Sequence, residues 1–208
     1  MDTISPFDST TQTAPNIIPH MEKVGDYLCT WNTPPSEHLA SVIIEDETLR
    51  DGIQGPFVRR PTLDQKLDML QHSVSVGTAQ AMLGFPASSA REFDDCLALL
   101  HNITREKWKL TPHFLGRPLE IDLAPIAALQ QAAECPVWAG FWINASPLRM
   151  RIENWNLPEL HRRIQGAGRF LQREGLPYSV SFEDSTRTPP ATLEALIRLC
   201  IDLSLIHI

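Results

Sequence analysis

The sequence has no basic block, no closely spaced pair of cysteines and no long apolar run, and each absence excludes a class of protein. Its 18 Lys and Arg are outnumbered by 25 Asp and Glu, so the formal net charge is −7 and a nucleic-acid partner is not expected. The four cysteines (Cys29, Cys96, Cys135 and Cys200) form no C-x-x-C motif, which argues against a disulfide framework and favours a reducing compartment. No apolar run approaches the roughly 20 residues of a membrane span, and the polar start lacks the apolar centre of a signal peptide. These absences favour a soluble, cytoplasmic protein that binds neither nucleic acid nor membrane.

The chain divides into a leader and a body. Residues 1–40 are rich in Ser, Thr and Pro with little hydrophobic periodicity, which predicts a flexible N-terminal leader. In residues 41–202 strand and helix patterns alternate. The predicted strands cover 42–44, 79–84, 110–115, 136–143 and 178–182, and a helical pattern follows each of them.

Local signals mark where the predicted helices begin. Thr62 to Gln65 and Ser89 to Glu92 each have the pattern of a capping box. In the first helix Leu63, Leu67 and Leu70 share one face and are expected to pack inward. Asn156 with Pro158 begins a long helix that is expected to stop at Gly175, and Thr188 is expected to cap the last helix.

Five strand–helix units of roughly 33 residues each have the size of βαβ units, and strict alternation predicts a parallel sheet. Two α/β architectures remain possible. One is an open doubly wound sheet, which is complete with five strands. The other is a (β/α)8 TIM barrel, which needs eight strands and about 250 residues. On the second interpretation, residues 41–202 are a catalytic domain truncated after about five units.

The last six residues, 203–208, permit two interpretations. They are apolar and fit the beginning of a sixth strand. They are also the translation of CTG-TCT-CTT-ATA-CAC-ATC, which matches a transposon-end adapter used in sequencing libraries. We therefore expect either a truncated sixth strand or adapter-derived residues, and on both interpretations the native protein extends further. Re-reading the raw nucleotide sequence distinguishes them.

Two polar clusters follow apolar strands, at 45–54 and 181–188. In parallel α/β folds this edge of the sheet is where sites form. Arg50 and Asp51 are adjacent, so in an extended strand they would point to opposite sides. A bend at Gly52 would be needed to bring both to one rim.

These clusters carry a family resemblance. Residues 46–54 (DETLRDGIQ) resemble the D-x-T-L-R-D-G-x-Q signature of the isopropylmalate, homocitrate and citramalate synthases. That family shares a metal-dependent barrel with hydroxymethylglutaryl-CoA lyase and the carboxyltransferase domain of pyruvate carboxylase. Residues 84–86 (GFP), Ser146-Pro147 and 181–188 (SFEDSTRT) resemble three further family motifs, each in the right order and at a strand end.

The resemblance implies a Claisen-type condensation of acetyl-CoA with a 2-keto acid, assisted by a divalent metal, Mg or Mn. It implies that Asp51 binds the metal, that Arg50 stabilises the developing oxyanion, and that Glu183 takes part in proton transfer. Gln54 and Ser181 are implied in substrate binding. A homodimer is expected for the full-length protein. Two alternatives remain open: a C–C lyase on the same scaffold and a non-catalytic paralogue.

The chain departs from the family at three places. Met82 stands where the family has a glutamate, and Gly140 where many synthases have a histidine. The family's His-x-His metal ligands come from strand seven, which is absent from this sequence. A site with Asp51 alone is expected to be open and weak, and the 208-residue chain is expected to be inactive and poorly stable.

Other polar and aromatic residues have structural interpretations. His113 is expected to be a packed histidine, and Trp138 and Trp142 are expected to pack in the core or against helices. Glu183 and Asp184 also fit helix-start acids favoured by the helix dipole. Asp184 and Arg187 are expected to pair with each other.

Overall fold

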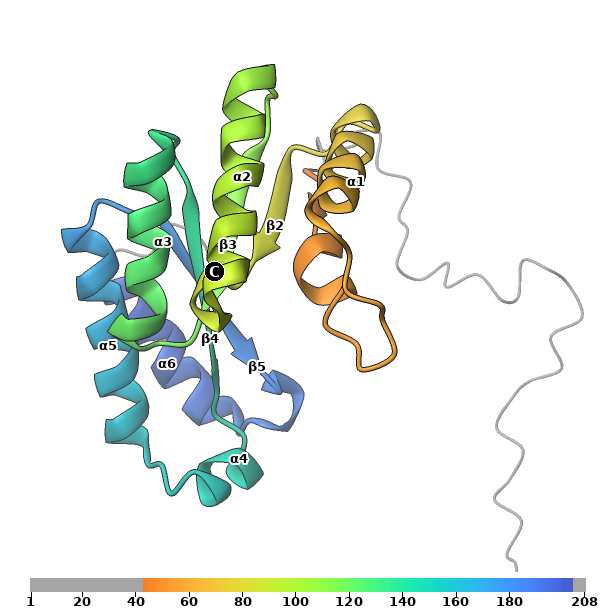
Figure 1. The fold of residues 1–208 in the computed structure, drawn as a ribbon. Helices are drawn as coiled ribbons and strands as arrows, with labels where there is room; N and C mark the ends of the chain where they lie inside the picture. Colours follow the sequence, from red (N-terminus) through yellow and green to blue (C-terminus); the bar gives the residue numbers. More distant parts are fainter. Residues whose placement is uncertain (1–42, 204–208) are drawn as a thin grey trace, which may run out of the picture. The chain divides into compact units, whose positions relative to one another are not determined.

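The computed structural model describes residues 43–203, which form one parallel sheet with its covering helices (Figure 1). The strands are β1 (Glu45–Asp46), β2 (Gln80–Gly84), β3 (Thr111–Gly116), β4 (Trp138–Asn144) and β5 (Tyr178–Glu183). They lie in the order β1-β2-β3-β4-β5, and every neighbouring pair is parallel. A doubly wound sheet reverses its strand order at a switch point, whereas a barrel keeps sequence order. The described residues are therefore five consecutive units of a barrel-type fold, which confirms the partial TIM barrel and not the doubly wound alternative.

Helices connect the strands and cover one face of the sheet. They are α1 (Leu63–Ser75), α2 (Ala90–Glu106), α3 (Glu120–Ala133), α4 (Pro147–Ile152), α5 (Leu157–Arg173) and α6 (Pro190–Asp202). Alternate strand residues, including Leu83, Phe114 and Phe141, share one apolar core with helix residues such as Leu99 and Ile164. The strand residues between them point to the opposite face, because side chains of a strand alternate. That opposite face carries the polar groups of the site.

A buried ion cluster joins α1 to α2. The capping box at Thr62 is formed as expected, with Gln65 N donating to Thr62 Oγ1. At the start of α2, Ser89 accepts from Glu92 N, but the Glu92 side chain turns away to accept from Lys66 Nζ at 3.0 Å. Lys66 is fully buried and lies 3.0 Å from Asp95 as well. The sequence predicts that Leu63, Leu67 and Leu70 form the inner face of α1, and this is only partly right because Lys66 also faces inward.

In α1, Leu70 is buried while Leu63 and Leu67 are half-buried, because the long stem and ion pairs of Lys66 fill the centre of the contact. A lysine is normally excluded from such a position unless it is paired. The ion cluster thus replaces apolar packing between these two helices.

Elsewhere the segment boundaries follow the sequence with three corrections. Ile43 and Ile44 are 65% and 59% exposed, so the first apolar run is not the buried strand that we expected. The short helix α4 was not expected from the sequence. The last helix begins at Pro190 without a side-chain cap, since the Thr188 hydroxyl donates to Asp184 O instead. The expected stop of α5 is confirmed, with Gly175 in the left-handed region at φ +67°.

The predicted leader, residues 1–40, and residues 204–208 lie outside the described residues. Leu203, the first residue of the six-residue end, is the C-cap of α6. Of the four cysteines, Cys96 and Cys200 are buried and Cys135 is half-buried, and these three are free thiols. No helix between residues 43 and 203 combines the length and apolar character needed to cross a membrane.

Candidate active site

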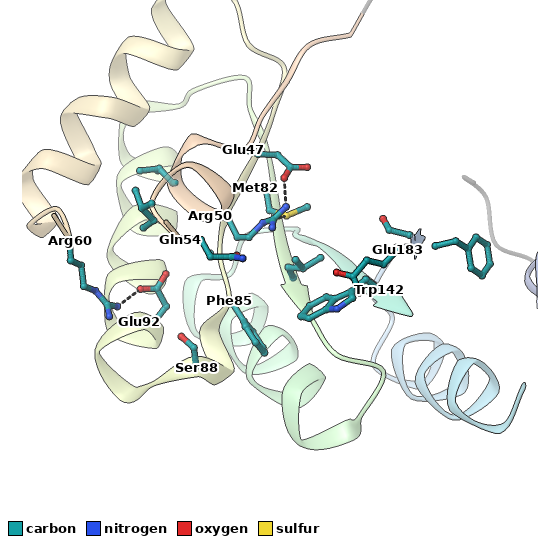
Figure 2. Close-up of a pocket in the computed structure, with 16 residues that line it drawn as sticks. Glu47, Arg50, Gln54, Arg60, Met82, Phe85, Ser88, Glu92, Trp142 and Glu183 are labelled. Carbon is teal, nitrogen blue, oxygen red and sulfur yellow. Dashed lines mark hydrogen bonds and ion pairs between the residues drawn. The ribbon is translucent and has the colours of Figure 1, made fainter. Parts of the chain in front are cut away.

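A cavity of about 630 Å³ opens at the carboxyl edge of the sheet (Figure 2). Its walls come from the segments that follow β1 and β2 and from residues on four strands: Met82, Gly84, Leu115, Trp142, Ser181, Phe182 and Glu183. Four of the sequence-predicted site residues line it: Arg50, Gln54, Ser181 and Glu183. Both polar clusters recognised in the sequence therefore meet at one cavity, as the strand-end argument predicts.

Arg50 lies in a tight turn rather than on an extended strand. Residues Thr48–Gly52 form a π-helical turn, in which the backbone N–H groups of Arg50, Asp51 and Gly52 all donate to Glu47 O at 3.1, 2.8 and 3.2 Å. The expectation of an extended strand with a single bend at Gly52 is thus wrong, because all of Thr48–Gly52 forms the turn. The turn places the Arg50 side chain, with Glu47 beside it, at the cavity edge.

The Arg50 guanidinium is held on three sides. Its Nη1 donates to Asp51 Oδ1 at 3.0 Å, its Nη2 to the Glu47 carboxylate, and its Nε to Met82 Sδ at 3.3 Å. Its side chain is only 18% exposed. A cation fixed in this way stabilises negative charge that develops beside it without having to reorient.

Glu183 and Ser181 enter the cavity from β5. They are two residues apart on one strand, so they point to the same side, and both are exposed to the cavity. Asn144 Nδ2 donates to Glu183 Oε2 at 3.5 Å, and Asn144 Oδ1 accepts from the backbone and hydroxyl of Ser146. Ser146, from the Ser-Pro motif, is buried and so supports Glu183 through Asn144.

The acid next to Glu183 has a structural partner. Arg187 Nε donates to Asp184 Oδ1 at 2.6 Å, which confirms the expected pair. This hydrogen bond is the main cause that lowers the pKa of Asp184, and a contact with Ser146 adds to it. Asp184 and Arg187 thus stabilise the loop that follows β5.

Asp51 is not among the residues that line the cavity, although it contacts one of them. Its side chain is 64% exposed, and its carboxylate contacts Arg50. Between residues 43 and 203 no three His, Cys, Asp or Glu side chains are placed to hold a metal ion together. By themselves the described residues therefore do not make up a divalent-cation site. Asp51 remains a predicted ligand.

The protein-family model described as HMGL-like matches residues 41–208. The chain belongs to the HMGL-like family. Homocitrate synthase AksA of Methanocaldococcus jannaschii is 33% identical over 175 residues, which are 83% of this chain and 39% of that protein. The 2-isopropylmalate synthase of Xylella fastidiosa (strain M23) is 29% identical over 175 residues, 82% of this chain and 32% of the relative. The 2-isopropylmalate synthase of Sulfolobus acidocaldarius is 28% identical over 162 residues, 77% and 40% of the two chains.

The family expected from the sequence motifs is thereby confirmed. The HMGL-like chain spans about a third to two-fifths of the length of these curated relatives.

The two departures in this HMGL-like chain both face the cavity side of the sheet. Met82 accepts the hydrogen bond from Arg50 Nε, so a thioether stands beside the guanidinium. A Cβ at Gly140 would lie 3.2 Å from Leu115 Cδ1, so Leu115 occupies the space in front of this position. Met82 and Leu115 therefore make this wall of the cavity apolar.

His113 lies on the cavity side of β3 but is not among the lining residues. It is buried, its Nδ1 lies 2.6 Å from Glu45 Oε1, and its ring stacks on Trp138 with centroids 5.6 Å apart. The hydrogen bond from His113 is the main cause that lowers the pKa of Glu45, and burial opposes it. The expectation of a packed histidine agrees with this geometry.

The sequence did not indicate several cavity residues. Arg60 and Glu92 form one end, where Arg60 Nη2 lies 2.7 Å from Glu92 Oε2 (Figure 2). The sequence pattern places Glu92 in a capping box, and Arg60 lies in a loop without periodicity. Trp142 packs edge-to-face on Phe85 at 5.9 Å, as a packing residue should, but both rings also line the cavity. The G-F-P motif was the available signal for Phe85.

Proposed function

We propose that the full-length protein condenses an acyl-CoA, in the first instance acetyl-CoA, with a 2-keto acid, and that water then hydrolyses the thioester of the condensation product and releases free CoA. One observation carries the proposal: Arg50 and Gln54 from the first motif share a cavity with Ser181 and Glu183 from the last. The curated relatives named homocitrate synthase and 2-isopropylmalate synthase support the same chemistry. The keto acid itself stays unassigned between these two kinds of relative.

In this proposal the fixed guanidinium of Arg50 stabilises the keto oxygen. That oxygen gains negative charge as the acyl carbon attacks the carbonyl, and a pre-oriented cation nearby lowers the barrier. Because Glu47, Asp51 and Met82 already hold Arg50, little reorganisation accompanies the step. Gln54 and Ser181 supply hydrogen bonds that orient the keto acid.

Glu183 is proposed as the group that takes part in removing a proton from the acyl methyl group. Its carboxylate faces the cavity and is positioned by Asn144. A general base must reach the proton that it abstracts, and a strand end at the cavity wall provides that reach. For the full-length protein we retain Mg²⁺ or Mn²⁺ as cofactor, with Asp51 as the ligand proposed from this chain.

A CoA-release assay tests the proposal. The full-length protein is incubated with acetyl-CoA and one of several 2-keto acids, and free thiol is measured over time. We expect release that depends on the keto acid and falls about 10²-fold in Glu183→Gln, which keeps the shape of the side chain but not its basicity. Thiol release without a keto acid, or equal rates in the Glu183→Gln variant, would refute the assignment.

The alternative on the same scaffold is C–C cleavage. This candidate is considered because the matching family model is described as HMGL-like and not as a synthase. It predicts that a 3-hydroxyacyl-CoA is consumed with formation of acetyl-CoA, whereas acetyl-CoA with a keto acid gives no free thiol. The two directions of thioester chemistry separate the candidates in one experiment.

A further inference from the structure

The active-site cavity has one continuous apolar wall. Met82 on β2, Leu115 on β3 and Trp142 on β4 lie on three successive strands of the sheet, and all three line the cavity. Phe85, which follows β2, also lines it and packs edge-to-face on Trp142. We call these four residues the apolar wall.

The middle of the apolar wall depends on a glycine in the neighbouring strand. Leu115 and Gly140 are register partners of β3 and β4. A Cβ at Gly140 would lie only 3.2 Å from Leu115 Cδ1, closer than an ordinary van der Waals contact. Because Gly140 has no Cβ, Leu115 can lie against β4 and join Met82 to Trp142. Gly140 is therefore a positioning residue that acts through Leu115.

The apolar wall runs between the two groups that are proposed to act on the substrate. At one end, Met82 Sδ accepts a hydrogen bond from Arg50 Nε at 3.3 Å. At the other end, Trp142 is the register partner of Ser181, and Figure 2 shows it near Glu183. A molecule that reaches from Arg50 to Glu183 therefore lies along this wall.

The cavity has no free cation for a second negative charge. Among the described residues, Arg50 and Arg60 are the cationic side chains that line it. Arg50 is paired with two neighbouring acids, and Arg60 is paired with Glu92 at 2.7 Å. Glu183 adds a further negative charge. A substrate carboxylate placed against the apolar wall would thus be desolvated without a partner, which is strongly unfavourable.

We propose that the 2-keto acid carries an uncharged, apolar side chain, and that Met82 and Leu115 select it. The inference rests on the proposed function, which places the keto oxygen at Arg50. The side chain is attached to the same carbon as that oxygen, so it meets Met82 beside Arg50 and then Leu115. Apolar contacts of this kind favour a substrate with a matching side chain. The absence of a free cation disfavours a keto acid with a second carboxylate.

A pair of keto acids with the same shape tests this inference. 2-Oxoglutarate and 5-methyl-2-oxohexanoate differ only at the end of the side chain, which is a carboxylate in the first and an isopropyl group in the second. Calorimetric titration of the full-length protein in Mg²⁺ buffer gives their affinities independently of turnover. We expect 5-methyl-2-oxohexanoate to bind at least 100-fold more tightly than 2-oxoglutarate. Pyruvate, with only a methyl side chain, should bind at least tenfold more weakly than the longer apolar acid.

Two variants examine the apolar wall itself. Leu115→Asn keeps the size of the side chain but makes it polar, so it should weaken 5-methyl-2-oxohexanoate about tenfold and pyruvate less than twofold. Gly140→Ala adds the Cβ that forces Leu115 to shift, and it should weaken the longer acid about threefold with the same small effect on pyruvate. Far-UV circular dichroism establishes that each variant is folded. If Leu115→Asn does not fold, Gly140→Ala and the wild-type comparison carry the test.

Matched controls make the same substitutions away from the cavity. Leu148, on α4, is 61% exposed and does not line the cavity. Gly166, on α5, has open space where a Cβ would stand. Leu148→Asn and Gly166→Ala should each change the affinity for every keto acid less than twofold. Met82→Leu exchanges one apolar side chain for another, so it should keep the preference for 5-methyl-2-oxohexanoate over 2-oxoglutarate.

Either of two results would overturn the inference: 2-oxoglutarate binding at least as tightly as 5-methyl-2-oxohexanoate, or equal losses in Leu115→Asn and Leu148→Asn. Keto-acid-dependent thiol release alongside such a result would leave the proposed function in place. The opposite combination is also distinguishable. Leu115-dependent binding of the apolar acid by a protein that releases no thiol with any keto acid would remove the proposed function and support the apolar site.

Discussion

Two regions of the molecule use the same arrangement, a cation between two carboxylates, for different ends. Lys66 lies between Glu92 and Asp95 with side-chain exposures of 0%, 7% and 10%. Arg50 lies between Glu47 and Asp51 with exposures of 18%, 44% and 64%. The first group is enclosed between α1 and α2, and only Glu92 reaches the cavity from it, whereas Arg50 and Glu47 of the second group both line the cavity. Burial, rather than charge pattern, separates a group that holds the scaffold from one that can meet a substrate.

The largest expected effect is on the closed group. Lys66→Met removes the cation and leaves Glu92 and Asp95 buried without it, which should cost about 3–5 kcal/mol in the free energy of unfolding. Urea denaturation followed by circular dichroism measures the change. Lys109→Met, at an exposed lysine, is the control and should stay within about 0.5 kcal/mol. A similar small loss for Lys66→Met would mean that the buried cluster is not structural.

The open group should respond in activity rather than stability. Arg50→Gln in the full-length protein should lower kcat/KM for CoA release about 10²–10³-fold, because a pre-oriented charge-stabilising donor is lost. Its unfolding free energy should change by less than about 1 kcal/mol, as for a partly exposed ion pair. Arg59→Gln, at an exposed arginine outside the cavity lining, is the control. Unfolding of Arg50→Gln with retained activity in the folded fraction would reverse the comparison.

A smaller effect is expected at Met82, which is buried and also contacts Arg50 through its sulfur. Met82→Leu keeps the volume but removes the sulfur that accepts from Arg50 Nε, so kcat should fall about fivefold while stability changes by less than about 1.5 kcal/mol. Met69→Leu on α1 is the matched substitution away from the cavity. If Met82→Leu leaves kcat unchanged, the thioether contact does not position Arg50.

The smallest effect concerns the pH dependence of the Glu45–His113 pair. The folded-state pKa of Glu45 is lowered, chiefly by the His113 hydrogen bond, so its stabilising contribution is present above the ordinary glutamate pKa and is lost as pH falls through the lowered value. Glu45→Gln should therefore destabilise the protein at pH 7, and the difference from wild type should disappear in strong acid. Unfolding midpoints across this range provide the measurement. A difference that grows on acidification would contradict the assigned sign.

The sequence predicted features that depend on neighbouring residues along the chain. The strand–helix alternation, the Thr62 capping box and the meeting of Arg50 with Glu183 at one edge all follow from local patterns and parallel topology. Burial of Lys66 could not be predicted, because its partners come from α2 and are brought there by packing. For the same reason Glu92 fulfils only half of its expected capping box.

The backbone conformation of the first motif also could not be predicted from the sequence pattern. The π-helical turn depends on three backbone N–H groups that share Glu47 O. No spacing of residue types in the sequence predicts this turn. The helix α4 has six residues, too few to show a helical period. Exposure of Ile43 and Ile44 depends on which chain segments cover β1, which composition alone does not indicate.

The central claim is that Arg50 and Glu183 act in one active site, and a double-variant cycle tests it most directly. Residues that act in the same transition state lose activity non-additively. We therefore predict that Arg50→Gln combined with Glu183→Gln in the full-length protein lowers kcat/KM for keto-acid-dependent CoA release by little more than the more damaging single change. Losses that multiply, as they do for independent sites, would contradict the claim.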